Sequence, residues 1–136
     1  MIGRNFIPLT SRIPIIALDT NILLDITRLK IPVFEQLDEL VGRAPCVVPI
    51  QVVQELQTLA TERGKTGVAA RIALELVKKR KVKIVSATAS SGDDALRDLA
   101  AKGYIIVTND RALRQSLKNA PQRAIVVRQS KYLAWL

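Results

Sequence analysis

Short apolar runs alternating with helical segments restrict the fold of this chain more than any other feature. Five runs have the length of strands, at 13–18, 46–48, 82–85, 104–107 and 124–127. Most are continuously apolar, which is typical of strands buried on both faces of a sheet. Apolar residues at helical spacing predict helices at 22–29, 32–41, 52–60, 67–80, 93–102 and 112–118. We therefore predict an α/β fold in three layers, with a central parallel sheet between helices.

The length of the chain fits one domain. Its 136 residues, 49% of them apolar, are enough to bury a substantial core. We predict an N-terminal extension at 1–12 and one domain at 13–136. The apolar tail at 130–136 is compatible with a further strand, a final helical turn or a contact surface. Such a surface would pack onto its own sheet or join two copies in a homodimer.

The distribution of charge predicts a polyanionic partner. The formal net charge is +9, and residues 1–60 carry 5 basic and 6 acidic side chains whereas residues 61–136 carry 16 and 6. Nucleic acid is the favoured partner, ahead of an anionic membrane surface or the basic surface of a thermophile. Lys78, Lys79 and Lys81 could line an RNA path, or could form a solvated helix end.

Two features of the composition exclude whole classes of chemistry. The chain has no histidine, which excludes Ser-His-Asp and Cys-His catalysis and most zinc sites. Its one cysteine, Cys46, lies in an apolar run and is expected to be a buried, inert thiol. No apolar run approaches the roughly 18 residues that a membrane helix needs. We therefore expect a cytoplasmic protein with no membrane partner.

Acidic residues follow the predicted strands. Asp19, Asp93 and Asp110 each come shortly after a strand, and Glu55 lies on a helix. Each aspartate could simply cap the helix that follows it. Together they point to a site, because the carboxyl ends of parallel strands meet at one edge of a sheet. Clustered carboxylates repel one another, so such a site implies a cation such as Mg²⁺ or Mn²⁺.

These motifs resemble those of a known family. Asp19-Thr20-Asn21, Glu55, Asp93-Asp94 and Thr108-Asn109-Asp110 resemble the four acidic motifs of PIN-domain endoribonucleases, in order and in spacing. The resemblance implies a PIN-like fold, a Mg²⁺ or Mn²⁺ site and cleavage of single-stranded RNA. It also implies a partner, which would be an antitoxin for the VapC-type toxins or a ribosome-assembly factor for the nucleases that process rRNA. The paired aspartates, the run Thr108-Asn109-Asp110-Arg111 and the ending Lys131-Tyr132-Leu133 look closer to the rRNA-processing branch and its archaeal relatives.

The resemblance assigns roles to single residues. Asp19, Asp93 and Asp110 would hold the metal and its attacking water, and Glu55 would complete the site directly or through water. Helical phase favours Asp93 over Asp94 as the ligand, because Asp93 shares the apolar face that packs on the sheet. Further RNA contacts are expected from the neighbouring Arg111 and Arg114. The alternatives are a catalytically silent RNA-binding scaffold and, more remotely, a phosphatase or a DNA flap nuclease.

Overall fold

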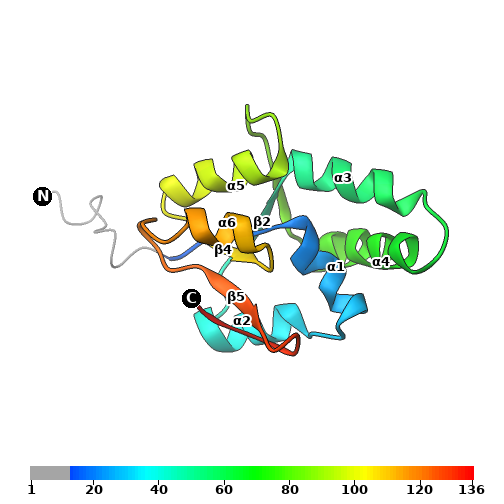
Figure 1. The fold of residues 1–136 in the computed structure, drawn as a ribbon, viewed down its shortest axis with the longest axis horizontal. Coiled ribbons are helices and arrows are strands. Elements are labelled where there is room, and N and C mark those ends of the chain that lie inside the picture. The colour runs from blue at the N-terminus through cyan, green and yellow to red at the C-terminus, as the bar shows by residue number, and fades with distance from the viewer. Residues whose placement is uncertain (1–12) are drawn as a thin grey trace, which may run out of the picture.

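Six strands form one sheet in the order β3-β2-β1-β4-β5-β6. Figure 1 labels β2, β4 and β5 of this sheet, drawn between α5 and α2. The computed structural model describes residues 13–136, and the predicted extension at 1–12 lies outside them. The strands are β1 (Ile16–Leu18), β2 (Cys46–Pro49), β3 (Lys83–Val85), β4 (Ile105–Thr108), β5 (Ile125–Arg128) and β6 (Tyr132–Trp135). All pairs from β3 to β5 are parallel, as predicted, whereas β6 runs antiparallel to β5.

The helices fill the connections between the parallel strands. They are α1 (Thr20–Arg28), α2 (Val33–Val41), α3 (Ile50–Ala60), α4 (Lys65–Lys79), α5 (Gly92–Ala101) and α6 (Arg111–Ser116). Each predicted helix is present, and the bounds differ by a few residues. The helices α1, α3 and α4 each begin two residues earlier than predicted, and α6 ends two residues earlier. The early start of α3 arises because it follows β2 without a loop. None of the helices within residues 13–136 is long and apolar enough to cross a membrane.

The sheet is covered on both faces, which explains its continuously apolar strands. Side chains of a strand point alternately to the two faces. In β1, Ile16 and Leu18 therefore pack into the larger core, formed with α1, α2, α3 and α4, whereas Ala17 packs into the smaller core, formed with α5 and α6. The strands β2 and β4 alternate in the same way. The predicted three-layer architecture is confirmed.

The apolar tail is a strand of this sheet. Gln129 and Ser130, both at φ +54°, make the tight turn between β5 and β6. The backbone N–H of Leu133 donates a hydrogen bond to Gln36 Oε1 on α2 at 2.7 Å, and the Leu133 side chain is buried. The tail thus packs onto its own sheet, as the first of the two predicted roles required. Tyr132 remains 41% exposed at this edge.

Candidate active site

Three predicted acidic residues meet at one small hollow beyond the carboxyl ends of the strands. Asp19 follows β1, Glu55 comes from the middle of α3, and Asp93 lies in the first turn of α5. The hollow has a volume of about 30 Å³, which is enough for about one water molecule or a small ion. Asp110 follows β4, the strand next to β1. Four segments that are distant in the sequence are brought together because their strands are parallel neighbours.

Asp19 is held by hydrogen bonds at both carboxylate oxygens. The backbone N–H of Ile22 donates to Oδ1 at 2.7 Å, so Asp19 caps α1. The hydroxyl of Thr108, at the end of β4, donates to Oδ2. The same hydroxyl oxygen accepts a hydrogen bond from the backbone N–H of Asp110 at 2.9 Å. Thr108, which is completely buried, thus links the two acidic motifs on neighbouring strands.

The capping role considered for the aspartates holds for two of the three. Asp110 caps α6 by accepting a hydrogen bond from the backbone N–H of Leu113 at 2.9 Å, as Asp19 caps α1. Asp93 is not a cap, because Ser91 caps α5 through a hydrogen bond from the backbone N–H of Asp94. Helix capping therefore does not explain why Asp93 lines the hollow.

Burial destabilises the ionised form of the Asp19 carboxyl group. Asp19 is only 4% exposed, and its pKa is raised to about 7, chiefly by burial. The hydrogen bonds from Thr108 and Ile22 lower this pKa, whereas the negative charges of Asp110 and Asp93 raise it. No cationic side chain contributes to the balance. An ionised Asp19 would therefore be stabilised by a cation at the hollow.

The donor set suits Mg²⁺ or Mn²⁺ in chemistry and charge. The charged side chains that line the hollow are all carboxylates, and Thr20 and Asn21 add neutral oxygen atoms, the ligand type that these hard ions prefer. Within residues 13–136, no three acidic, cysteine or histidine side chains already converge on one point. Mg²⁺ does not need such a cage, because it is usually bound by one or two carboxylates together with water and substrate phosphate. The residues therefore fit a partly hydrated ion.

Asp93 and Asp94 point to different surroundings. Asp93 lines the hollow, as its helical phase predicts. Asp94 instead accepts hydrogen bonds from Arg97 Nη1 and from the Ser90 hydroxyl, both at 3.0 Å, and lies on the exposed side of α5. Geometry thus favours Asp93 as the residue able to reach a metal.

The structure adds one acidic residue that the sequence analysis did not single out. Asp25, on α1, is 3% exposed. Its carboxylate accepts hydrogen bonds from Asn109 Nδ2 at 2.8 Å and from Arg28 Nη2 at 3.0 Å. Asn109 is the residue between Thr108 and Asp110, so Asp25 ties the loop that carries Asp110 to α1. The sequence signal that could have identified Asp25 is a single aspartate among the apolar residues of a predicted helix.

A second positioning contact was also missed. Gln51, at the start of α3, donates hydrogen bonds from Nε2 to the backbone carbonyls of Ala87 and Ala89, both at 2.9 Å. These carbonyls belong to the loop that leads into α5. The amide thus fixes the approach of Asp93 relative to the helix that carries Glu55. A glutamine at a helix start carries no sequence signal for such a contact.

The predicted RNA-binding residues do not form one surface. Arg111 and Arg114 lie on α6, the helix capped by Asp110, at the acidic edge. Lys78 and Lys79 lie in the last turn of α4, and Lys81 follows that helix and precedes β3. These three lysines thus lie at the edge of the sheet where the parallel strands begin, opposite the edge that carries the acidic residues.

Comparison with known proteins identifies the family. Residues 16–130 match the family described as PIN like domain. The chain belongs to the PIN-domain family. This match spans the parallel sheet and all four acidic motifs, and it confirms the resemblance drawn from those motifs.

Two archaeal relatives are similar to this PIN domain along most of its length. Ribonuclease VapC9 of Archaeoglobus fulgidus is 36% identical over 127 residues, covering 92% of the chain and 85% of the relative. Ribonuclease VapC4 of Methanocaldococcus jannaschii is 30% identical over 120 residues, covering 84% of the chain and 90% of the relative.

Solved structures agree with the fold. The PIN domain endonuclease Utp24 superposes with a TM-score of 0.72 at 25% identity, covering 90% of the chain and 92% of that structure. A domain of a functionally unknown protein from Methanocaldococcus jannaschii superposes with a TM-score of 0.59 at 19% identity, covering 85% of the chain and 91% of that structure. The second likeness supports the fold alone.

Proposed function

We propose that this PIN domain is a metal-dependent endoribonuclease that hydrolyses phosphodiester bonds in single-stranded RNA. The observation that carries the proposal is the meeting of Asp19, Glu55 and Asp93 at one hollow, with the charge of Asp110 acting on the buried Asp19. The names of the relatives, two ribonucleases and one endonuclease, support the same reaction class.

Asp19, Asp93 and Asp110 would hold Mg²⁺ or Mn²⁺, with Glu55 contributing directly or through water. When bound, such an ion activates water as a nucleophile and neutralises charge that develops on the phosphate. Thr108 and the N–H of Ile22 orient the Asp19 carboxylate, so that its geometry is fixed before substrate arrives. Asp25 and Gln51 hold the two loops that present Asp110 and Asp93.

The backbone of the RNA would be held by the arginines of α6. Arg111 and Arg114 lie on the helix that Asp110 begins, so they can bind phosphates next to the acidic hollow. Only 4% of the residues are aromatic, so phosphate contacts rather than base stacking would dominate the affinity.

The decisive experiment measures cleavage of an unstructured RNA in Mn²⁺, in Mg²⁺ and with a chelator. We expect cleavage that requires the metal and is abolished in Asp19→Asn and in Asp93→Asn. Metal should also raise the melting temperature of the wild type more than that of Asp19→Asn, which reports on binding without relying on activity. RNA binding without cleavage in any metal would instead support the silent scaffold. Hydrolysis of a phosphomonoester or of a DNA flap, but not of RNA, would support the remaining alternatives.

The cellular role is a separate part of the proposal. Both ribonuclease relatives bear VapC names, which favours a toxin-type RNase with an antitoxin partner, and the other role is processing of rRNA precursors. The neighbouring reading frame tests this directly. A small antitoxin-like gene beside this one would favour the toxin role, and co-purification of its product with the nuclease would establish the pair.

A further inference from the structure

Helix α6 carries two parts of the proposed site, because Asp110 begins it and Arg111 and Arg114 lie on it. The helix is short, with 6 residues from Arg111 to Ser116. A helix of fewer than two turns makes few hydrogen bonds of its own and depends on its neighbours for its position. The placement of Asp110 relative to Asp93 therefore depends on what holds α6 against α5.

Apolar packing brings the two helices together. Leu113 of α6 and Leu117, which follows this helix, belong to the same small core as Leu96 and Leu99 of α5. Packing of this kind is non-directional. It keeps α6 close to α5, but it constrains the rotation of a short helix less than a directional contact does.

A single arginine supplies the directional contact. Arg97 Nε, on α5, donates a hydrogen bond to the Ser116 hydroxyl at 3.1 Å, and Arg97 Nη1 donates to Asp94 Oδ1 at 3.0 Å. Within residues 13–136, the bond to Ser116 is the only side-chain hydrogen bond that joins α6 to another helix. Because the guanidinium group is planar and rigid, its two contacts fix its orientation as well as its distance from α6.

Two further hydrogen bonds continue this bridge to the acidic residue at the start of α6. The Ser116 hydroxyl donates to the backbone carbonyl of Leu113 at 2.7 Å. The backbone N–H of Leu113 in turn donates to Asp110 Oδ1 at 2.9 Å. The carboxylate of Asp110 is thus bound to the same turn of α6 that Arg97 holds.

The other end of the bridge is anchored in the first turn of α5. Asp94 Oδ2 accepts a hydrogen bond from the Ser90 hydroxyl at 3.0 Å, and the backbone N–H of Asp94 donates to the Ser91 hydroxyl at 3.2 Å. Asp94 therefore holds Arg97 from the turn that also carries Asp93. The side chain of Arg97 is 40% exposed, so these contacts are expected to contribute little to global stability.

We propose that Arg97 is a positioning residue of the nuclease, which holds α6 against α5 and so sets the Asp110 carboxylate relative to Asp93. The inference rests on the proposed function, because it takes both carboxylates as ligands of one ion. Ligands on separate helices bind an ion tightly only when supporting contacts keep the helices in place. Asp94 acts through Arg97, and Asp94→Asn retains an oxygen that can accept the same hydrogen bond.

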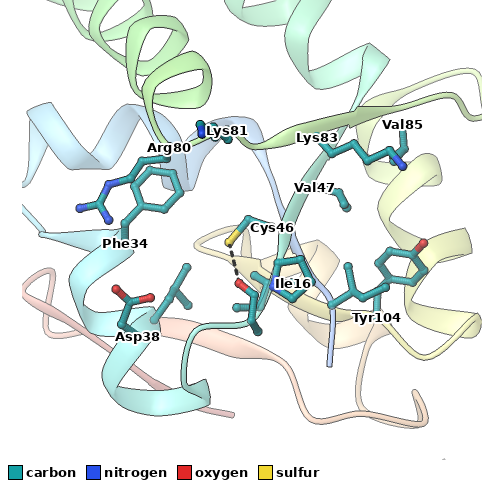
Figure 2. Close-up of a pocket in the computed structure, with 14 residues that line it drawn as sticks. Ile16, Phe34, Asp38, Cys46, Val47, Arg80, Lys81, Lys83, Val85 and Tyr104 are labelled. Atoms are coloured by element: carbon teal, nitrogen blue, oxygen red, sulfur yellow. Dashed lines mark hydrogen bonds between the residues drawn. The ribbon is translucent and has the colours of Figure 1, made fainter. Parts of the chain in front are cut away.

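Ser116 offers a substitution that breaks the bridge without changing any charge. Ser116→Ala removes the acceptor for Arg97 Nε, and alanine favours the helix. Ser116→Thr retains the hydroxyl and is the matched control. Arg97→Met removes the other partner and keeps an apolar stem. Lys83→Met controls for the loss of a positive charge, because Lys83 lines a separate hollow at the opposite edge of the sheet (Figure 2).

The test is calorimetric titration of the full chain with Mn²⁺ in the absence of RNA, followed by the Mn²⁺ dependence of RNA cleavage. We expect Ser116→Ala and Arg97→Met each to weaken Mn²⁺ binding about three- to tenfold, less than the roughly 10–100-fold cost of losing a group that supports a metal ligand directly. The double variant should bind no more weakly than either single variant, because both changes break the same contact. Cleavage should fall at limiting Mn²⁺ and recover at saturating Mn²⁺. Ser116→Thr and Lys83→Met should match the wild type, and the melting temperature without metal verifies each fold.

The two readouts separate this proposal from the nuclease function. Undiminished Mn²⁺ binding in Ser116→Ala and Arg97→Met would overturn the positioning role and leave the nuclease function intact. Equal losses in Ser116→Ala and Ser116→Thr, or a loss in Arg97→Met alone, would also overturn it, because the bridge would then not be the cause. Weaker Mn²⁺ binding in both bridge variants of a chain that cleaves no RNA would support the positioning role and exclude the nuclease reaction. Absence of Mn²⁺ binding by the wild type would overturn both.

Discussion

The side-chain amide of Asn109 donates a hydrogen bond to the buried carboxylate of Asp25 at 2.8 Å, joining the loop after β4 to α1. This contact spans 84 positions of the sequence and lies beside Asp110. It makes the position of Asp110 depend on a carboxylate that does not line the hollow.

Asp25→Asn is expected to lower both stability and cleavage. The change removes the charge that Arg28 and Asn109 bind, and loss of buried hydrogen bonds of this kind costs about 1–3 kcal/mol. Cleavage should fall even at temperatures where the variant is fully folded, because Asp110 is no longer held. Chemical denaturation and single-turnover cleavage measure the two effects. Asp98→Asn, at an exposed position of α5, is the control and should change neither. In a double-mutant cycle with Asn109→Ala, strict additivity would contradict the contact.

Thr108→Val is expected to impair the site while preserving side-chain shape. The hydroxyl donates to the buried Asp19 carboxylate and accepts from the partly buried N–H of Asp110, so its loss leaves both groups without this partner. We expect a loss of about 1–3 kcal/mol in the free energy of unfolding and a clear fall in cleavage rate. Thr108→Ser retains the hydroxyl and should restore most of the activity. Equal activity of the serine and valine variants would show that the hydroxyl has no role.

Asp19 predicts a pH dependence of stability in the absence of metal. Its pKa is about 7 in the folded chain against 3.8 for an ordinary aspartate, so the folded state holds the proton more tightly. The stabilising contribution is complete below pH 3.8 and is lost as the pH rises through about 7. The shift corresponds to at most about 4 kcal/mol, at about 1.36 kcal/mol per pKa unit.

The measurement compares wild type with Asp19→Asn in a chelator, by denaturation at pH 4 to 8. Asp19→Asn cannot ionise at position 19, so its stability relative to wild type should rise from pH 4 to about 7 and level off above that pH. Titrating groups that do not interact with Asp19 cancel in this difference, whereas Asp110 and Asp93, whose charges act on Asp19, do not cancel fully. Parallel profiles for the two proteins would show that the Asp19 carboxylate is not destabilised by burial.

Asp93→Asn and Asp94→Asn should separate the two neighbouring aspartates. Asp93 lines the hollow, so its variant should lose cleavage at limiting Mn²⁺ and recover at most partly at saturating Mn²⁺. Asp94 is half exposed and paired with Arg97, so its variant should lose no more than about 1 kcal/mol of stability and keep its activity. Loss of activity confined to Asp94→Asn would reverse the assignment.

Two paired substitutions should locate the RNA. Replacing Arg111 and Arg114 by glutamine should weaken RNA binding and flatten its salt dependence by about 1.4 in the log–log slope, at about 0.7 per phosphate contact for single strands. Replacing Lys78 and Lys79 should have a smaller effect, because these lysines lie at the opposite edge of the sheet. Filter binding of RNA across a range of salt concentrations gives the salt slope for each pair of substitutions. Both pairs are made in the Asp19→Asn variant, which is expected not to cleave the RNA. A larger change for the lysine pair would place the RNA over the other edge.

The fold was largely predictable because its signal is local. Continuous apolar runs predicted strands buried on both faces, and helical spacing predicted the helices between them. The antiparallel direction of β6 was not predictable, because the tail at 130–136 has no periodicity that separates a strand from a helical turn. The tight turn at Gln129 and Ser130 decides it, and neither residue is the glycine or asparagine that usually marks such a turn.

The sequence alone determined that Asp19, Asp93 and Asp110 would lie at one edge, because each follows a strand and parallel strands end on the same side. Only the tertiary structure decided how these acids differ. It buries Asp19, and it supports Asp110 through Asn109 and the distant Asp25. It also places Lys81 and Lys83 at the opposite edge, around a hollow built from the starts of several strands. Burial and hydrogen bonding depend on neighbours that are remote in the chain, and local patterns carry no information about which neighbours those will be.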